Sequence, residues 1–303
     1  MKRIIVLLFI SLLVACSAKP FEWESLSILS PKGAPALSLV PLIQENKDSI
    51  EFVDGADILS AELIKGEKDL IIAPVNLGAA LSKKDSNPYR LYGIVTWGNL
   101  YLVSNSDVSL VKDEPIALFG EQAVPGLVFN SIKEQLDLSF VSTAFNAVTD
   151  VQGQLISKSF NIGLMAEPLV TATIAKAKTL ETPINLSVYK DVQSLWQEKT
   201  GFENYPQAAV FIKSDMSADK LKQVDARFEM MMAYNLEINN KPSILETDIT
   251  EDVSATLGVP SSKILAQAWE RMNVNVVKAS DNKDSIEAFL ELFKLNGLEN
   301  LYY

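Results

Sequence analysis

Histidine is absent from this chain of 303 residues, and cysteine occurs once, at Cys16. Without histidine the chain lacks the most frequent general base, the usual zinc and copper ligand, and the base of a Ser-His-Asp triad. A single cysteine excludes an intramolecular disulfide, a cysteine-rich zinc site and an iron–sulfur cluster held by cysteines alone. These absences argue against a transition-metal enzyme or a serine hydrolase, and we expect neither a metal nor a cofactor.

Acidic residues also outnumber basic ones: the chain has 27 lysines and arginines and 38 aspartates and glutamates, which gives a formal charge of −11. Nucleic acid attracts proteins with excess positive charge, so we expect no nucleic-acid partner. Neither a P-loop nor a GxGxxG motif is present. Apolar residues, in contrast, make up 48% of the chain, which is enough for one large or two medium domains at roughly 150 residues per domain.

The first residues have the order of a secretion signal. A basic start, Met1-Lys2-Arg3, precedes an apolar run over residues 4–15, IIVLLFISLLVA. This run is shorter than the roughly 20 residues that a membrane-spanning helix needs. The cysteine follows at once, in Leu13-Val14-Ala15-Cys16. We predict a signal peptide over residues 1–15; an ordinary secretory peptide followed by a chance cysteine remains the alternative.

The segment Leu13-Val14-Ala15-Cys16 resembles the lipobox of bacterial lipoproteins. The resemblance implies cleavage before Cys16 and attachment of acyl chains, such as palmitate, to this residue. Two acyl chains suffice for stable anchoring in a membrane. Removal of Lys2 and Arg3 lowers the 27 basic residues to 25 against 38 acidic ones, a charge of −13. Residues 16–25 then form a lipid-anchored tether at the extracytoplasmic face of the bacterial cell membrane.

Beyond the tether, short apolar strands alternate with helices of about ten residues. In the first part of the chain we predict strands at 26–29, 50–53 and 69–73, helices at 35–45 and 56–65, and a longer β region at 89–104. Pro41 lacks an amide donor and predicts a kink or a late start of the first helix. Apolar strands separated by helices are typical of a parallel sheet that is covered on both faces.

A second unit of the same design follows. We predict strands at 115–119, 138–142, 162–166, 186–189 and 208–212, helices at 125–136, 149–158, 169–178 and 191–199, and a mostly helical remainder from residue 217. The predicted fold class is therefore α/β with two lobes, each a mostly parallel sheet flanked by helices. We assign residues 26–106 and 214–303 to lobe 1 and residues 107–213 to lobe 2, with crossovers near 104–113 and 209–215.

Three features could carry a binding site. Glu167 ends a buried strand, where ligands of open α/β sheets bind, although a carboxylate there could equally cap a helix. Trp97 stands beside Gly98 and Asn99 and could stack on a planar ligand or pack in the core. The loops at 30–35 and 120–126 would present backbone amides at helix starts, which is also common turn chemistry.

Three motifs together with the lipobox resemble the solute-binding lipoproteins of ABC importers. They are Pro31-Lys32-Gly33-Ala34-Pro35-Ala36, Asp69-Leu70-Ile71-Ile72-Ala73-Pro74-Val75-Asn76 and Gly163-Leu164-Met165-Ala166-Glu167-Pro168. The branch for nitrate, sulfonates, taurine and thiamine-precursor pyrimidines is the most similar, over roughly residues 26–295. The resemblance implies a type II periplasmic-binding-protein fold that closes on a small molecule about a hinge and is recognised by an importer permease. We expect a monomer.

The resemblance also implies a set of ligand-binding residues in the cleft between the lobes. They are Gly33, Ala34, Pro35, Asn76, Trp97 and Asn99 in the first lobe, and Glu121, Thr149, Asp150 and Glu167 in the second. Only Lys32 supplies positive charge near these loops. We therefore expect a small, polar, nitrogen-containing ligand rather than nitrate or a simple sulfonate.

Two other classes of function stay open. One is an enzyme on the same fold, similar to the dehydratases of the alternative menaquinone route. The other is a surface lipoprotein that binds another protein. The signal peptide and the lipobox favour the non-catalytic receptor over the enzyme, because such metabolic enzymes would work in the cytosol.

Overall fold

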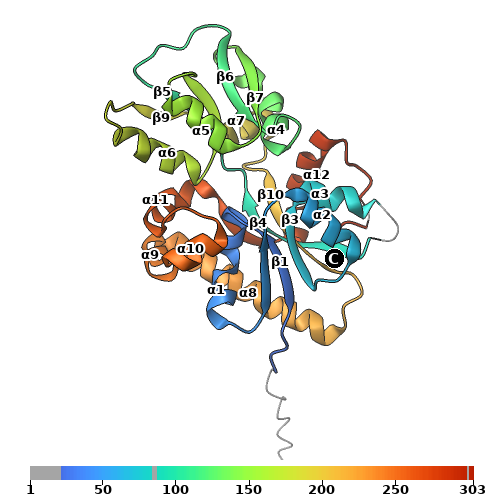
Figure 1. Ribbon diagram of the computed structural model, residues 1–303. Helices are drawn as coiled ribbons and strands as arrows, with labels where there is room; N and C mark the ends of the chain where they lie inside the picture. The colour runs from blue at the N-terminus through green and yellow to red at the C-terminus, as the bar shows by residue number, and fades with distance from the viewer. Residues whose placement is uncertain (1–21, 84–86, 299) are drawn as a thin grey trace, which may run out of the picture.

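A computed structural model describes residues 22–83, 87–298 and 300–303. Cys16, the predicted signal peptide and most of the predicted tether lie outside the described residues. The chain forms two lobes, each built around one β-sheet (Figure 1). No helix within the described residues has both the length and the apolar character needed to cross a membrane.

The first lobe contains a six-stranded sheet in the order β11-β4-β10-β3-β1-β2. Strand β1 runs parallel to β2 and β3, whereas β10 is antiparallel to β3 and β4, and β11 is antiparallel to β4. The strands are β1 (Ser27–Pro31), β2 (Ser49–Val53), β3 (Leu70–Pro74), β4 (Tyr89–Trp97), β10 (Pro206–Lys213) and β11 (Val274–Lys278).

The second lobe repeats this arrangement in a five-stranded sheet of order β7-β6-β8-β5-β9. Strand β6 is parallel to β7 and β8, and β5 is antiparallel to β8 and β9. The strands are β5 (Leu100–Asn105), β6 (Glu114–Phe119), β7 (Phe140–Phe145), β8 (Ile162–Ala166) and β9 (Leu186–Asp191). The predicted two-lobed α/β fold is confirmed, but the sheets are mixed rather than mostly parallel. The reason is that β5 and β10 each enter a sheet from the other lobe and run antiparallel within it.

The chain passes between the lobes earlier than the pattern predicts. β4 ends at Trp97 in one sheet and β5 begins at Leu100 in the other, so the first crossing is Gly98-Asn99. The return runs through residues 201–205 into β10. The predicted crossovers, near 104–113 and 209–215, lie after these points. The reason is that β5 and β10 are both buried and apolar, so the sequence pattern assigned each of them to the lobe that precedes it in the chain. Burial alone does not say which sheet a strand joins.

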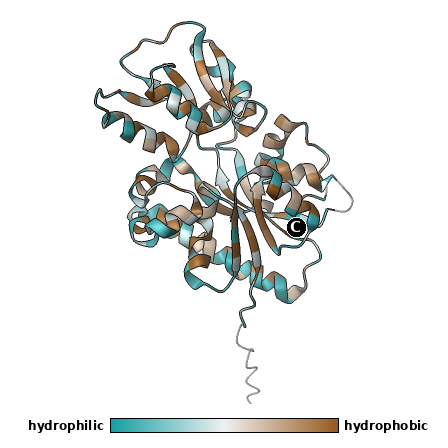
Figure 2. Ribbon diagram, in the orientation of Figure 1, coloured by the Kyte–Doolittle hydropathy of each residue, from teal (hydrophilic) through white to brown (hydrophobic). Residues whose placement is uncertain are grey.

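Helices cover the sheets of both lobes. The first lobe has η1 (Ala34–Leu39), α1 (Val40–Glu45), α2 (Ala56–Lys65), α3 (Val75–Ser82), α8 (Ala218–Asn240), η3 (Pro242–Ile244), α9 (Leu245–Asp248), α10 (Glu251–Leu257), α11 (Ser262–Met272), η4 (Ala279–Asn282), α12 (Lys283–Leu290) and η5 (Glu291–Phe293). The second has α4 (Val124–Ile132), η2 (Lys133–Gln135), α5 (Val148–Ile156), α6 (Leu169–Lys178) and α7 (Val192–Thr200). Strands in the sheet centres are hydrophobic, and many helices carry hydrophilic residues as well (Figure 2).

An aromatic stack joins the two lobes at the two crossings, residues 98–99 and 201–205, which together are called the hinge. Tyr205 is fully buried in the returning crossover. Its ring centroid lies 5.4 Å from that of Trp196 of α7, and its ring stacks on Phe289 of α12 with 5.7 Å between the centroids. The amide of Gly98 donates to the carbonyl of Tyr205 at 2.8 Å, so the two crossings are bonded to each other. The hinge is therefore a packed part of the hydrophobic core.

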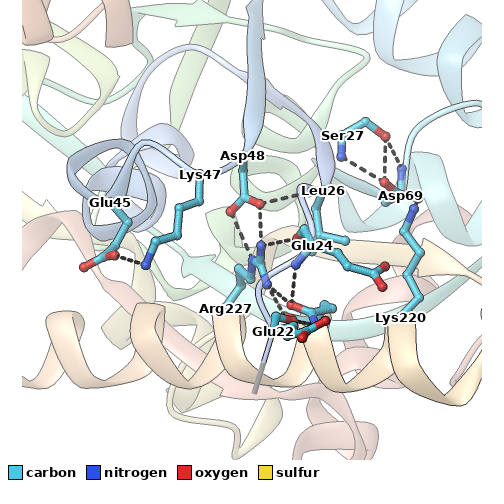
Figure 3. A network of polar contacts seen from close by, with 11 residues as sticks. Glu22, Glu24, Leu26, Ser27, Glu45, Lys47, Asp48, Asp69, Lys220 and Arg227 are labelled. Atoms are coloured by element: carbon cyan, nitrogen blue, oxygen red, sulfur yellow. Dashed lines mark hydrogen bonds and ion pairs between the residues drawn. The ribbon is translucent and has the colours of Figure 1, made fainter. Parts of the chain in front are cut away.

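Residues 22–27 are held against the first lobe by a network of polar contacts on α8 (Figure 3). Arg227 forms a two-point ion pair with Asp48 and also donates to the carbonyl of Glu24. Gln223 Oε1 accepts a hydrogen bond from the amide of Glu24, and Gln223 Nε2 donates to the carbonyl of Glu22. The network fixes the chain directly before β1, at the end of that strand opposite to Pro31.

Candidate ligand-binding cleft

A cavity of about 340 Å³ lies between the lobes, beyond the carboxyl ends of β1 and β3. The first lobe contributes Pro31, Lys32, Ala34, Pro35, Pro74, Thr96, Gln207 and Ala208; the first crossing and the second lobe contribute Asn99, Leu100, Phe119, Val124, Pro125, Ala166 and Glu167. This is where open α/β sheets bind ligands. Most of the lining is proline and small or branched apolar side chains, so the site can enclose an apolar body.

The loop that follows β1 reaches the cavity through residues of the predicted site. Ala34 and Pro35 line it, and Gly33 precedes them with a φ of 95° and an amide that donates to the carbonyl of Leu257 at 2.8 Å. An L side chain rarely adopts such a φ, so glycine is needed for this turn. Gly33 therefore positions the loop, and its neighbours provide the contact surface.

Asn99 and Glu167 also line the cavity and are bonded to each other through the main chain. The amide of Glu167 donates to the carbonyl of Asn99 at 3.0 Å, and Asn99 Nδ2 donates to the carbonyl of Glu167 at 3.0 Å. Asn99 is 5% exposed, and within the described chain its Oδ1 has no hydrogen-bond partner. This oxygen is thus an available acceptor beside the crossing.

Other predicted residues lie outside the lining of this cavity. Trp97 is largely buried, donates from Nε1 to the carbonyl of Asn275 at 3.0 Å and lines a different cavity at the hinge. Asn76 lies in the first turn of α3, with an enclosed Oδ1 that has no partner among the described residues.

In the second lobe, Glu121, Thr149 and Asp150 also lie away from the cavity lining. Glu121 is exposed in the loop between β6 and α4. Asp150 Oδ2 accepts the amide of Ala147 at 3.0 Å and so caps α5, next to the exposed Thr149. The prediction that a helix begins near Thr149 and Asp150 is confirmed, but the first turn of this helix does not line the cavity.

The carboxylate of Glu167 is engaged within the protein. Its side chain has no exposed surface, and Arg271 Nε donates to Oε1 at 2.7 Å. Thr171 donates to the same carboxylate from its amide at 3.0 Å and from Oγ1 at 2.8 Å. Arg271 lies on α11, and nothing in the sequence around it predicts this pairing.

The contact between Arg271 and Glu167 links the two lobes. Arg271 belongs to the first lobe and Glu167 and Thr171 to the second, and α11 lies next to α6 where the two lobes meet (Figure 1). The hydroxyl of Tyr101 in β5 donates to the carbonyl of Arg271 at 3.0 Å. Burial, and then the carboxylates of Asp191 and Glu167, raise the pKa of Tyr101 above its ordinary value, so the hydroxyl keeps its proton at neutral pH.

Charged groups in the cavity are few and already paired. Lys32, the one basic residue among the described lining residues, forms an ion pair with Asp54 at 2.6 Å. No cluster of three or more histidine, cysteine, aspartate or glutamate side chains that could hold a metal occurs in the described part of the chain. The cavity can therefore recognise a ligand by shape and by neutral hydrogen bonds from Thr96, Asn99 and Gln207.

No protein-family model matches the chain, and no curated protein matches it either. Solved structures do. An ABC transporter protein from Parabacteroides distasonis is 20% identical, with 92% of this chain and 95% of that chain covered and a TM-score of 0.74. The periplasmic aliphatic sulphonate binding protein SsuA from Escherichia coli is 12% identical, with 93% and 92% covered and a TM-score of 0.66.

A third similar structure is the ligand-binding component of an ABC-type import system from Staphylococcus aureus, solved with zinc bound. It is 11% identical, with 92% of this chain and 96% of that chain covered and a TM-score of 0.63. Identities this low show the fold alone. The chain has the two-lobed fold of ABC-importer solute-binding proteins, and the resemblance inferred from the sequence is confirmed at that level.

Proposed function

We propose that this chain, which has the fold of ABC-importer solute-binding proteins, is an extracytoplasmic receptor that captures a small solute between its lobes and delivers it to an importer permease. The observation that carries this proposal is the cavity beyond the strand ends, to which both lobes contribute. Among the described lining residues Glu167 carries the one carboxylate, and Arg271 and Thr171 bind it, which supports ligand binding rather than acid–base catalysis.

The lining supports a compact, nitrogen-containing ligand with a largely apolar body. Asn99 Oδ1 can accept a hydrogen bond from an N–H group of the ligand, and Pro35, Phe119 and Pro125 can pack against its faces. A bare anion or a sulfonate finds no unpaired basic side chain among the described lining residues, because Lys32 is already paired with Asp54. The ligand that co-purifies with the protein, identified by mass spectrometry, provides the test compound.

Filling the cavity is expected to abolish or strongly weaken ligand binding. Ala166→Phe places a phenyl ring in a cavity of about 340 Å³, and we expect affinity for the co-purifying ligand to fall at least tenfold in calorimetry. Ala123→Phe is the matched control, because Ala123 is exposed in the loop before α4 and does not line the cavity. Unchanged affinity in Ala166→Phe, with the fold retained by circular dichroism, would contradict the placement of the site.

Membrane attachment is expected to depend on Cys16. Cys16→Ala removes the only thiol that could be acylated, so the protein should move from the membrane fraction to the soluble or secreted fraction. Ser17→Ala, one residue further, should leave the distribution unchanged. Fractionation followed by immunoblotting measures both, and membrane retention of the Cys16→Ala variant would overturn the lipoprotein assignment.

A further inference from the structure

A second cavity, of about 350 Å³, lies at the hinge and shares no lining residue with the cleft. It forms where Trp97 ends β4 and where residues 202–204 lead into β10. The first lobe completes it with Asn273, Asn275, Asn282 and Ser285. Four asparagines and one glutamate, Glu203, thus surround a cavity to which the proposed solute capture assigns no role.

Two asparagines of this hinge pocket, Asn273 and Asn282, turn their amino groups toward main-chain carbonyls. Asn273 Nδ2 donates to the carbonyl of Gly98 at 2.5 Å, and Asn282 Nδ2 donates to the carbonyl of Lys278 at 3.0 Å. Within the described chain neither Oδ1 atom has a hydrogen-bond partner. One N–H of each amide is thus engaged with the main chain, and the Oδ1 of each side chain stays free to accept a hydrogen bond in the pocket.

Three further side chains of the lining donate to main-chain carbonyls. Trp97 Nε1 donates to Asn275, Ser285 Oγ donates to the carbonyl of Asn204 at 3.1 Å, and Asn204 Nδ2 donates to Gly98. Glu203 is exposed and forms no ion pair with any described residue. The pocket therefore combines several free acceptor oxygens with one unpaired negative charge.

We propose that the hinge pocket binds an organic ammonium ion, R–NH₃⁺, as a site separate from the solute cleft. An ammonium group carries three donors and no acceptor, which matches the Oδ1 atoms of Asn273 and Asn282 and the carboxylate of Glu203. A carboxylate or a phosphate would instead meet the unpaired carboxylate of Glu203, which repels an anion. The chain's formal charge of −11 adds a general attraction for cations.

The test uses ethylammonium chloride as the probe and isothermal calorimetry on the purified protein at constant ionic strength. We expect saturable binding of ethylammonium, and at least tenfold weaker binding of tetramethylammonium, which has the same charge but no N–H donor. Glu203→Gln is expected to weaken ethylammonium binding about tenfold, because a charge-assisted hydrogen bond is lost. Glu198→Gln is the control, since Glu198 is exposed on α7 and outside the pocket.

Three results would overturn the proposal: no saturable ethylammonium binding, equal binding of the two cations, or equal binding by the Glu203→Gln variant and the parent. The Ala166→Phe variant separates the two sites. We expect it to bind ethylammonium as the parent does, because the hinge pocket shares no lining residue with the cleft. Loss of ethylammonium binding in that variant would place the ion in the cleft and refute the hinge site, whatever the fate of the transported solute.

Discussion

Replacing Arg227 by alanine is expected to lower the free energy of unfolding by about 3 to 5 kcal/mol, because it leaves the buried carboxylate of Asp48 without its partner. The side chains of Arg227 and Asp48 are 1% and 3% exposed. Arg227 Nε and Nη2 donate to the two oxygens of Asp48 at 3.1 and 2.7 Å, and the amide of Leu26 also donates to this carboxylate (Figure 3). One neutral amide does not compensate the charge.

Urea denaturation of the Arg227→Ala variant and the parent measures this loss. The control is Lys222→Ala on the same helix α8, because Lys222 pairs with Asp219 at an exposed position and the loss of this pair should change the stability little. The double variant Arg227→Met, Asp48→Leu should recover much of the stability, because apolar side chains remove the buried charge altogether. A loss below about 1 kcal/mol in Arg227→Ala would show that Asp48 gains water or another partner instead.

Replacing Arg271 by alanine is expected to shift the equilibrium between the lobes toward a more open arrangement by about tenfold. The variant loses the bonds to Glu167 and Thr171, which join α11 of one lobe to the second lobe. A hydrogen bond to a charged group contributes roughly 1.5 to 3 kcal/mol. Because the side chain of Arg271 is 40% exposed and partly screened by water, we take the lower end of that range.

Distances between spin labels or fluorophores on α6 and α11 measure the opening. Exposed Lys176 and Lys263 can each be replaced by cysteine in a Cys16→Ala background, which has no other thiol. Without ligand, Arg271→Ala should give a longer distance and a larger radius of gyration in small-angle scattering than the parent. The control Ser262→Ala, on the same helix, should leave the distance unchanged. Equal distances in Arg271→Ala and the parent would show that the ion pair does not hold the lobes together.

Local signals in the sequence predict most of the helices and strands. The helix at 56–65 and the strand at 162–166 have the predicted bounds, because each is a short apolar segment between clear turn or capping residues. Pro41 delays the first α-helix as expected, so that η1 precedes α1 and the proline lies in the first turn. Two elements were missed: α3, for which no helix was predicted, and β11, which lies in a region that the pattern predicts as helical.

The candidate site was predictable only in part. Ala34, Pro35, Asn99 and Glu167 follow strands or crossings whose ends meet in the cleft, which is a consequence of the α/β topology. Trp97 and Asp150 also follow strands or begin helices, yet one faces the hinge pocket and the other caps its own helix. Sequence spacing places a residue near the end of an element, but the direction of its side chain depends on how the element packs.

Composition and hydrophobic periodicity by themselves established an α/β chain without a histidine-dependent or disulfide-bonded site, because these properties depend on residue type and on neighbours along the chain. The tertiary structure alone decided which sheet β5 and β10 join, and that Arg227 meets Asp48 and Arg271 meets Glu167, across 179 and 104 positions of sequence. A local pattern reports how far a residue is buried. Which distant charge or strand it meets depends on the packing of the whole chain, where the burial of a carboxylate requires a partner that only the folded arrangement brings within reach.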